Sequence, residues 1–139
     1  MIVDESTDFG ARAAAHLRED IVVWLTTISG KSGPLPIPVW FVWDGAETVL
    51  MFSQDRARVR NLEADPRVSL NFAGDGRGGD IVVLSGRATV ERDGPRTPEV
   101  GAYVQKYAEH IERIGHTPES FGDDYSVPVR IELTKLRGH

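Results

Sequence analysis

Apolar and polar residues alternate along several short segments of the chain, which is the pattern expected of half-buried β-strands. The alternation is clearest at residues 35–43 (LPIPVWFVW), where it predicts one continuous strand. Further strands are predicted at 21–29, 47–52, 67–73, 80–92 and 125–136. Gly30 to Pro34 and Asp44-Gly45 predict turns, and Gly86 predicts a bulge or bend in the long strand 80–92.

Helices are predicted between these strands. Residues 6–20 carry helix-forming alanines behind a capping triplet (STD), and residues 55–65 form a short helix that ends before Pro66. The triplet Thr-Pro-Glu occurs at 97–99 and again at 117–119. Each copy offers a capping hydroxyl, a proline for the first helical position and an acid for the first turn, so each predicts the start of a helix.

The order of elements predicts the fold class. A helix, three strands, a second helix, two strands, further helices and a last strand indicate an α+β, mainly β fold, with antiparallel hairpins closing a small barrel. The 139 residues suit one domain, expected to span residues 1–139, and no repeat or linker divides them.

Composition excludes several classes of function. The absence of cysteine rules out disulfides, thiolate metal sites and a cysteine nucleophile. The net charge of −5 argues against nucleic acid as a partner, because phosphate binding needs a basic surface. No apolar run is long enough to span a membrane, and the acidic start is unlike a signal peptide, so a cytoplasmic protein with no membrane partner is expected.

Two prolines interrupt the amide pattern of the predicted strand 35–43. Pro36 and Pro38 are two positions apart, so both lack the N–H that would point to the same edge of the strand. At these two positions, this edge of the strand therefore cannot donate backbone hydrogen bonds to a neighbouring strand. A protected sheet edge is one interpretation, and a flat ligand lying beside Val39 and Trp40 is the other.

A second candidate site lies at the start of the helix 55–65. Arg56, Arg58 and Arg60 sit where free backbone amides and the helix dipole favour an anion, and Ser53 can add a hydroxyl. A solvent-exposed helix face paired with nearby acids is the alternative. Arg56 and Arg60 share one face and Arg58 points elsewhere, so at most two of the three are expected to meet one phosphate.

Other apparent motifs carry less weight. Residues 74–79 (GDGRGG) match a dinucleotide fingerprint by letter, but a strand rather than a helix is predicted to follow, so we interpret them as a hairpin loop. The four histidines are scattered without metal-ligand spacing and are expected at the surface or terminus. No catalytic acid, base or nucleophile stands out, so a bound cofactor is expected to carry any chemistry.

These features together resemble a known family. The run from Leu25 to Leu70 combines Leu-Thr-Thr, Pro-x-Pro-Val-Trp-Phe, a strand ending in serine, Arg-x-Arg-x-Arg-Asn-Leu and Asp-Pro-Arg-Val. It resembles the pyridoxamine 5′-phosphate oxidase-like flavin and deazaflavin proteins. It is most similar to their actinobacterial branch associated with coenzyme F420, an 8-hydroxy-5-deazaflavin.

The resemblance implies a homodimeric split β-barrel of the FMN-binding type, with six or seven antiparallel strands in Greek-key order and short flanking helices. It implies an F420-dependent oxidoreductase that transfers a hydride between the deazaflavin and a small unsaturated organic substrate. Ser53, Arg56 and Arg58 would hold the cofactor phosphate, with Arg60 and Asn61 nearby. The ring would lie against the remaining positions, which are Pro38, Val39, Trp40 and, less directly, Thr27.

One departure from the family bears on the cofactor. Flavin-using members have more basic residues on the strand that here reads Pro-Ile-Pro-Val-Trp, which favours F420 over FMN. The segment that binds pyridoxal phosphate in the true oxidases is not recognisable. The alternatives are an FMN-dependent oxidoreductase on the same barrel and a non-catalytic cofactor- or tetrapyrrole-binding protein. The helix from Thr97 and the loop 74–79 are expected to shape the substrate side.

Overall fold

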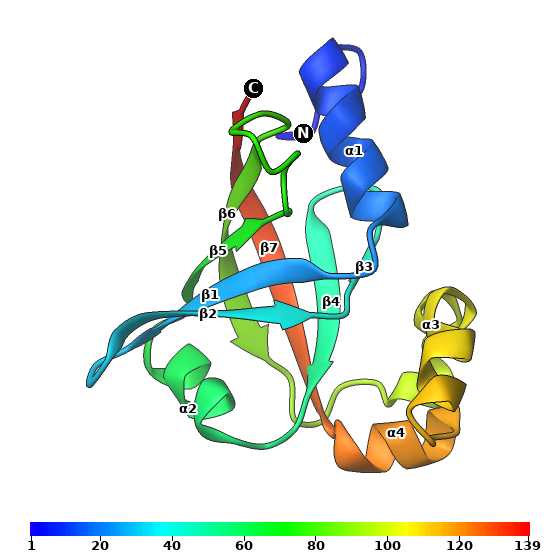
Figure 1. The fold of residues 1–139 in the computed structure, drawn as a ribbon. Helices are drawn as coiled ribbons and strands as arrows, with labels where there is room; N and C mark the ends of the chain where they lie inside the picture. Colours follow the sequence, from blue (N-terminus) through cyan, green and yellow to red (C-terminus); the bar gives the residue numbers. More distant parts are fainter.

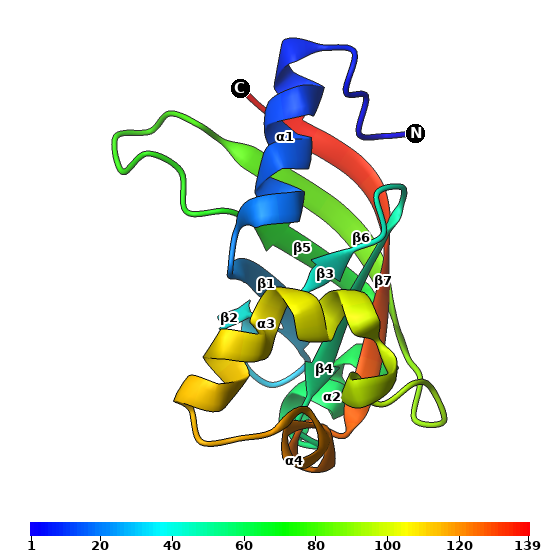
Figure 2. The same ribbon diagram turned by 90° about the vertical axis from the view of Figure 1, so that its right-hand side faces the viewer.

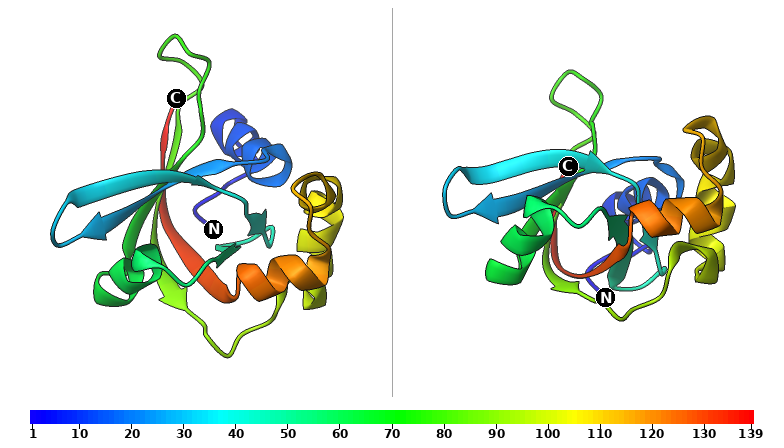
Figure 3. Two further views of the ribbon diagram at one scale, coloured as in Figure 1. Left: turned by 60° about the horizontal axis from the view of Figure 1, so that its bottom comes forward. Right: turned by 90° about the horizontal axis from the view of Figure 1, so that it is seen from below.

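The computed structural model describes all residues from 1 to 139. Seven antiparallel strands form one curved sheet in the order β2-β1-β5-β6-β7-β4-β3, which closes into a half-barrel with helices on its flanks (Figures 1 and 3). The strands are β1 (Val23–Ser29), β2 (Gly33–Val39), β3 (Val42–Trp43), β4 (Thr48–Ser53), β5 (Arg67–Asn71), β6 (Val82–Val90) and β7 (Val127–Gly138). The predicted mainly β antiparallel fold is confirmed.

Four α-helices and one 3-10 turn complete the molecule. They are α1 (Asp8–Glu19), α2 (Ala57–Ala64), the 3-10 turn η1 (Thr97–Glu99), α3 (Gly101–Arg113) and α4 (Pro118–Asp124). Figure 2 shows α1 above and α3 below the short strand β3, and α4 beneath α3. None of these helices is long and apolar enough to cross a membrane.

The prediction of one strand over residues 35–43 is wrong. The segment divides into β2, which pairs with β1, and β3, which pairs with β4, and the strands β2 and β3 end the sheet on opposite sides. One straight strand cannot serve both ends of a sheet, so the chain breaks its hydrogen-bonding pattern at Trp40 and Phe41 and crosses over. The strand also begins earlier than predicted, at Gly33.

The prediction of an open strand edge at Pro36 and Pro38 is confirmed. Strand β2 is the last strand on its side of the sheet, with β1 as its only neighbour. The β1–β2 hairpin extends beyond the body of the half-barrel (Figure 1). Because proline has no N–H, this outer edge cannot donate hydrogen bonds to another strand at these two positions.

The predicted irregularity at Gly86 is also confirmed. The pairing of β6 with β7 shifts register between Ser85 and Gly86. A side chain at Gly86 would place its Cβ 2.8 Å from the carbonyl oxygen of Glu132 and 2.8 Å from Cγ2 of Ile131. Glycine therefore lets the two strands approach closely where the barrel bends.

Of the predicted helix starts, two have the expected capping hydrogen bond and one does not. The hydroxyl of Thr7 accepts a hydrogen bond from the N–H of Gly10, 3.0 Å away, and caps α1. Thr117 caps α4 in the same way, accepting from the N–H of Ser120. Thr97 does not cap α3: it lies inside a 3-10 turn, its hydroxyl is buried without a partner, and α3 begins only at Gly101.

The apolar side chains form two clusters. The larger one, of 23 residues, fills the half-barrel and the inner face of α1. The smaller one joins Leu50 and Phe52 of β4 to Tyr103, Tyr107 and Ile111 of α3 and to Phe121 of α4. This second cluster attaches α3 and α4 to the outside of the sheet and so forms one wall of the site described next.

Candidate functional site

A pocket of about 360 Å³ opens where the end of β2 meets α3 and α4. Helix α2 lies on one side of this region and α3 and α4 on the other (Figure 1). Eight of its eleven lining residues are hydrophobic. The lining residues are Ile37, Pro38, Val39, Trp40, Phe52, Gln54, Arg58, Tyr103, Ile114, Phe121 and Tyr125.

Four nearly parallel aromatic rings form a continuous stack at this pocket. Trp40 stacks on Tyr107, with ring centroids 4.9 Å apart and an angle of 10°, and on Phe121 at 5.6 Å and 14°. Phe121 in turn stacks on Tyr125 at 4.3 Å and 9°. Such a stack is rigid and forms an apolar wall of the pocket, although the faces of its inner rings are covered by their stacking partners.

Tyr107 fixes the position of Trp40. Its buried hydroxyl accepts a hydrogen bond from the N–H of Phe41 at 2.9 Å. The same hydroxyl lies 2.7 Å from the carbonyl oxygen of Ile21 and 2.9 Å from that of Phe41, and its one hydrogen can be donated to either. Burial raises the pKa of Tyr107, although the hydrogen bond with Phe41 opposes the rise, so the hydroxyl stays protonated.

Arg58 is the only cation among the lining residues. It is half-buried, and no ion pair in the molecule includes it. Burial lowers the pKa of Arg58, and the charge of Arg56 lowers it further, while Tyr125 acts in the opposite direction. A desolvated guanidinium without an acidic partner is a ready site for an anion.

The start of α2 adds to this anionic preference. The helix has eight residues, Arg56 is at its N-cap, and its first turn contains no acidic residue. The free amides of a helix N-terminus carry partial positive charge, which favours an anion there. Arg58 belongs to this first turn, so the free amides and the guanidinium lie in the same part of the molecule.

The structure brings together four of the residues singled out in the sequence. Pro38, Val39, Trp40 and Arg58 line the same pocket, although 18 positions separate Trp40 from Arg58. As predicted, Arg58 differs in position from Arg56 and Arg60, and it is the one arginine of the three that lines the pocket.

The remaining predicted residues do not line the pocket. Ser53 is buried at the end of β4, and its hydroxyl donates to the carbonyl oxygen of Gln54 at 2.7 Å. Thr27 is buried in β1, whereas Arg56 and Arg60 are exposed and Asn61 is half-buried on α2.

Several lining residues had no motif in the sequence. Phe121 and Tyr125 lie more than 80 positions after Trp40 and reach it only because α4 folds back on the sheet. Tyr103 of α3 and Ile114 at its C-cap line the pocket, which supports the expectation that the helix following Thr97 borders the site. No sequence motif identifies Gln54, which is notable only for its position between Ser53 and the three arginines.

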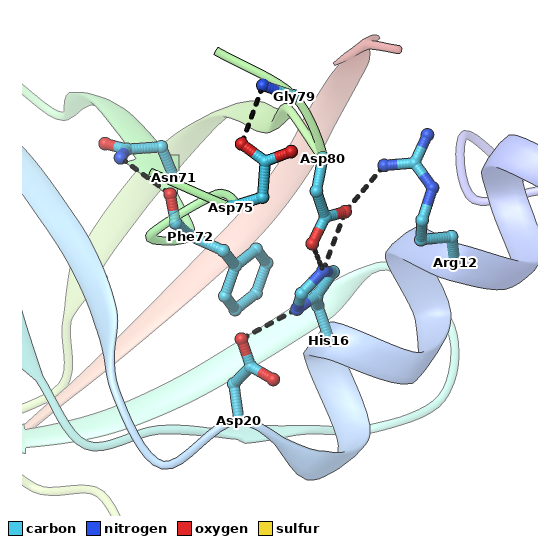
Figure 4. Close-up of polar contacts among 8 residues, drawn as sticks. All are labelled: Arg12, His16, Asp20, Asn71, Phe72, Asp75, Gly79 and Asp80. Carbon is cyan, nitrogen blue, oxygen red and sulfur yellow. Dashed lines mark hydrogen bonds and ion pairs between the residues drawn. The ribbon is translucent and has the colours of Figure 1, made fainter. Parts of the chain in front are cut away.

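The loop 74–79 is placed differently from expectation. None of its residues lines the pocket, and the loop lies beside α1 (Figure 4). Within the loop, Asp75 accepts hydrogen bonds from the N–H groups of Arg77 and Gly79. Strand β6 follows the loop, as predicted, so the dinucleotide fingerprint lacks the helix that it would need.

Two histidines are less exposed than expected. His16 and His110 are both partly buried, and Nδ1 of His110 is buried without a hydrogen-bond partner.

The sequence from residue 9 to residue 138 matches the family model of pyridoxamine 5′-phosphate oxidase. The chain belongs to this family. Among solved structures, a conserved hypothetical protein from Mycobacterium tuberculosis is similar to this member at 22% identity and a TM-score of 0.66, over 91% of this chain and 81% of that one. No curated protein sequence matches the chain.

Two further solved structures have the same fold as this pyridoxamine 5′-phosphate oxidase family member. One is an F420 reductase, at 18% identity and a TM-score of 0.62, over 88% of this chain and 94% of that one. The other is an FAD-binding protein from Mesorhizobium loti, at 21% identity and a TM-score of 0.61, over 91% and 90%. At sequence identities of 18% and 21%, the structural similarity establishes a shared fold.

Proposed function

We propose that this member of the family is an oxidoreductase that binds coenzyme F420 in the pocket beside β2 and passes a hydride to a small unsaturated organic substrate. The observation that carries the proposal is one pocket that combines a rigid aromatic wall, which includes Trp40, with a half-buried, unpaired Arg58. A planar ring with an anionic tail needs these two environments side by side. The F420 reductase of the same fold is consistent with this choice.

The residues present fit such a cofactor. Pro38, Val39 and Trp40 offer the ring an apolar surface, and Arg58 offers its tail a charge-assisted hydrogen bond. Ser53, Arg56, Arg60 and Asn61 remain candidates for the tail in this proposal, and Thr27 for the ring. Ser53 would first have to release its hydrogen bond to Gln54.

The chain's own residues would act by orientation and by excluding water. When bound in its reduced form, a deazaflavin supplies a hydride. The rigid aromatic wall would help to orient a bound substrate, and the mainly apolar lining would keep solvent away from the reacting atoms. The pocket contains no carboxylate and no imidazole, so we propose that any proton required comes from solvent.

A second copy of the chain is part of the proposal. Trp24, Pro34, Pro36 and Pro38 are exposed on one face of the β1–β2 hairpin, where Trp24 lies opposite Pro38 in the pairing. Burying this apolar face against another molecule would be favourable, and Pro38 also borders the pocket. The prolines prevent β-sheet addition along this edge, so we propose a homodimer joined by side-chain packing.

We also propose that the protein acts in the cytoplasm, on small molecules rather than on nucleic acid.

An FMN-dependent oxidoreductase is the second candidate. The FAD-binding protein of the same fold favours it, because the aromatic wall and Arg58 suit a flavin phosphate as well as a deazaflavin phosphate. The basic residues expected on β2 for flavin binding are absent, and this is why we prefer F420.

Titration of the purified protein with F420 and, separately, with FMN tests the proposal. We expect saturable binding of F420 with a change in its fluorescence, followed by oxidation of reduced F420 in the presence of quinones or enones. Binding of FMN alone would establish the second candidate. Binding of either cofactor without turnover of any acceptor would instead indicate a cofactor-binding protein.

Replacement of the guanidinium tests the site. Arg58→Gln is expected to weaken F420 binding by roughly 1.5–3 kcal/mol, about 10- to 150-fold, because one or more charged hydrogen bonds to the tail are lost. Arg137→Gln is the matched control, since Arg137 is exposed on β7 outside the pocket. Equal affinity for F420 in the Arg58 variant and the control would place the tail elsewhere.

A further inference from the structure

A second cavity, of about 270 Å³, lies between α1, β3 and α3. Figure 2 shows these three elements side by side. The cavity shares no lining residue with the first pocket. Its apolar part is formed by Leu17, Val42, Trp43 and Ala102, and its polar part by Arg18, Gln105 and Lys106.

Lys106 is a half-buried cation without an acidic partner. Its ammonium group makes one hydrogen bond, 3.1 Å long, to the carbonyl oxygen of Phe41, and lies 3.8 Å from the centre of the Phe41 ring. An ammonium group has three donors, so two remain free. No ion pair of the molecule includes Lys106.

Arg18, the other cation that lines the cavity, is already paired with Glu5 through two hydrogen bonds of 2.7 and 2.9 Å. Asp20 attracts Lys106 from a distance, but its carboxylate is bound to Nδ1 of His16 at 2.7 Å. The positive charge of Lys106 therefore has no directly paired acid, although Asp20 and the rings of Phe41 and Tyr107 offset part of it.

The surroundings of Lys106 make its charge costly. Burial lowers the pKa of Lys106 to about 8, against the opposing attraction of Asp20. A carboxylate placed at the free donors would restore much of the stabilisation that water gives to an exposed ammonium. The neighbouring indole of Trp43, already covered on one side by the guanidinium of Arg18 at 4.9 Å, would give the rest of such a ligand a flat apolar contact.

We propose that this cavity is a second ligand site, which binds a small aromatic carboxylate. The carboxylate pairs with the ammonium group of Lys106, and the aromatic ring packs against Trp43, Leu17 and Val42. Gln105 stands at the exposed rim, where its side-chain amide can donate to the second carboxylate oxygen. The site is independent of the proposed cofactor site, because the two cavities have different lining residues and different cations.

Benzoate is the probe for this proposal, and benzamide is its uncharged counterpart of nearly the same shape. Each is titrated into the full chain while ¹H–¹⁵N NMR spectra follow the indole N–H of Trp43, assigned with Trp43→Phe. We expect saturable shifts with benzoate, with a Kd of about 1 mM for so small a ligand. Benzamide should bind about tenfold more weakly, because it lacks the charge. Equal binding of the two compounds would overturn the proposal.

Variants identify the cavity that is used. Lys106→Met keeps the length of the side chain and removes its charge, and is expected to weaken benzoate binding about tenfold. Lys135→Met, on the exposed part of β7, is the matched control and should bind as the unmodified chain does. If Arg58→Gln abolishes the shifts and Lys106→Met does not, benzoate occupies the first pocket and the proposal is wrong. The comparison of benzoate with benzamide uses the unmodified chain, so it tests the proposal even if a variant fails to fold.

Discussion

Nε2 of His16 lies 2.9 Å from Oδ2 of Asp80, which joins α1 to the residue that follows the glycine-rich loop (Figure 4). Nδ1 of the same imidazole lies 2.7 Å from Asp20, and Arg12 donates to Asp80 at 2.7 Å. Since both ring nitrogens face carboxylates, the arrangement suits the doubly protonated imidazolium. Helix α1 is therefore held to the loop by a charged network whose strength depends on pH.

The first prediction concerns this pH dependence. Burial alone lowers the pKa of His16, but the hydrogen bonds to Asp20 and Asp80 outweigh it, so the net pKa is raised above 6.5. A raised pKa means that the stabilisation is complete below the unfolded value and is lost as the pH rises through the folded value. We expect His16→Gln to lower the free energy of unfolding by about 1 kcal/mol at pH 6 and by less at pH 9.

Urea denaturation between pH 5 and pH 9 measures this difference. His139→Gln serves as the control, because His139 is exposed at the carboxyl end of the chain. Its denaturation midpoint should follow that of the unmodified chain at every pH. A destabilisation by His16→Gln that stays constant with pH would show that the imidazole acts by packing alone, for instance against Phe72, on which it stacks at 5.0 Å.

The second prediction concerns the backbone at Asp80. Its φ of 53° is the only positive value among the non-glycine residues. Asparagine tolerates this left-handed region better than alanine, while both remove the charge. We expect Asp80→Ala to be less stable than Asp80→Asn by about 1 kcal/mol in urea denaturation. Equal stabilities would mean that the loop relaxes once the ion pairs are lost.

The third prediction concerns the close approach of β6 and β7. Gly86→Ala would bring a methyl group 2.8 Å from the carbonyl oxygen of Glu132, and we expect a loss of about 1–3 kcal/mol from this overpacking. Gly30→Ala is the matched control, because no atom lies within 4 Å of the added carbon there and its stability should change little. Thermal denaturation of the two variants measures the contrast. A Gly86 variant as stable as the control would show that the strands move apart freely.

The fourth prediction concerns the hydroxyl that positions Trp40. Tyr107→Phe leaves the buried N–H of Phe41 without its acceptor, and we expect a loss of about 1–3 kcal/mol in the free energy of unfolding. Tyr103→Phe removes the same group from an equally buried ring whose hydroxyl makes no hydrogen bond within the protein, so it should cost little. The two variants are compared by urea denaturation. If they are equally stable, the N–H of Phe41 has found another acceptor.

The fifth prediction follows from the proposed homodimer. Trp24 is 38% exposed on the apolar face of the β1–β2 hairpin. Trp24→Lys should place a charge in the interface and shift the protein from dimer to monomer in sedimentation velocity at micromolar concentration. Arg87→Glu, at an exposed position on β6, is the control and should leave the sedimentation coefficient unchanged. A monomeric unmodified chain would refute the dimer itself.

Local features of the structure were largely predictable from the sequence. The alternation of side chains located most of the strands, Gly86 located the register shift, and the two prolines located the sheet edge. These features depend on neighbouring residues and on backbone chemistry alone. The capping at Thr117 was predictable for the same reason, whereas Thr97 was not, because packing against α4 draws it into a buried 3-10 turn instead.

The sequence by itself determined the strand periodicity, the open proline edge, the basic helix start and the family to which these residues point. Tertiary structure alone decided that the strand breaks at Trp40, that Arg58 rather than Arg56 or Arg60 reaches the pocket, and that α4 completes the aromatic stack. The physical reason is the distance along the chain over which each effect acts. Propensity and periodicity act over a few residues, whereas a pocket forms where segments that are distant along the chain bury their apolar surfaces together.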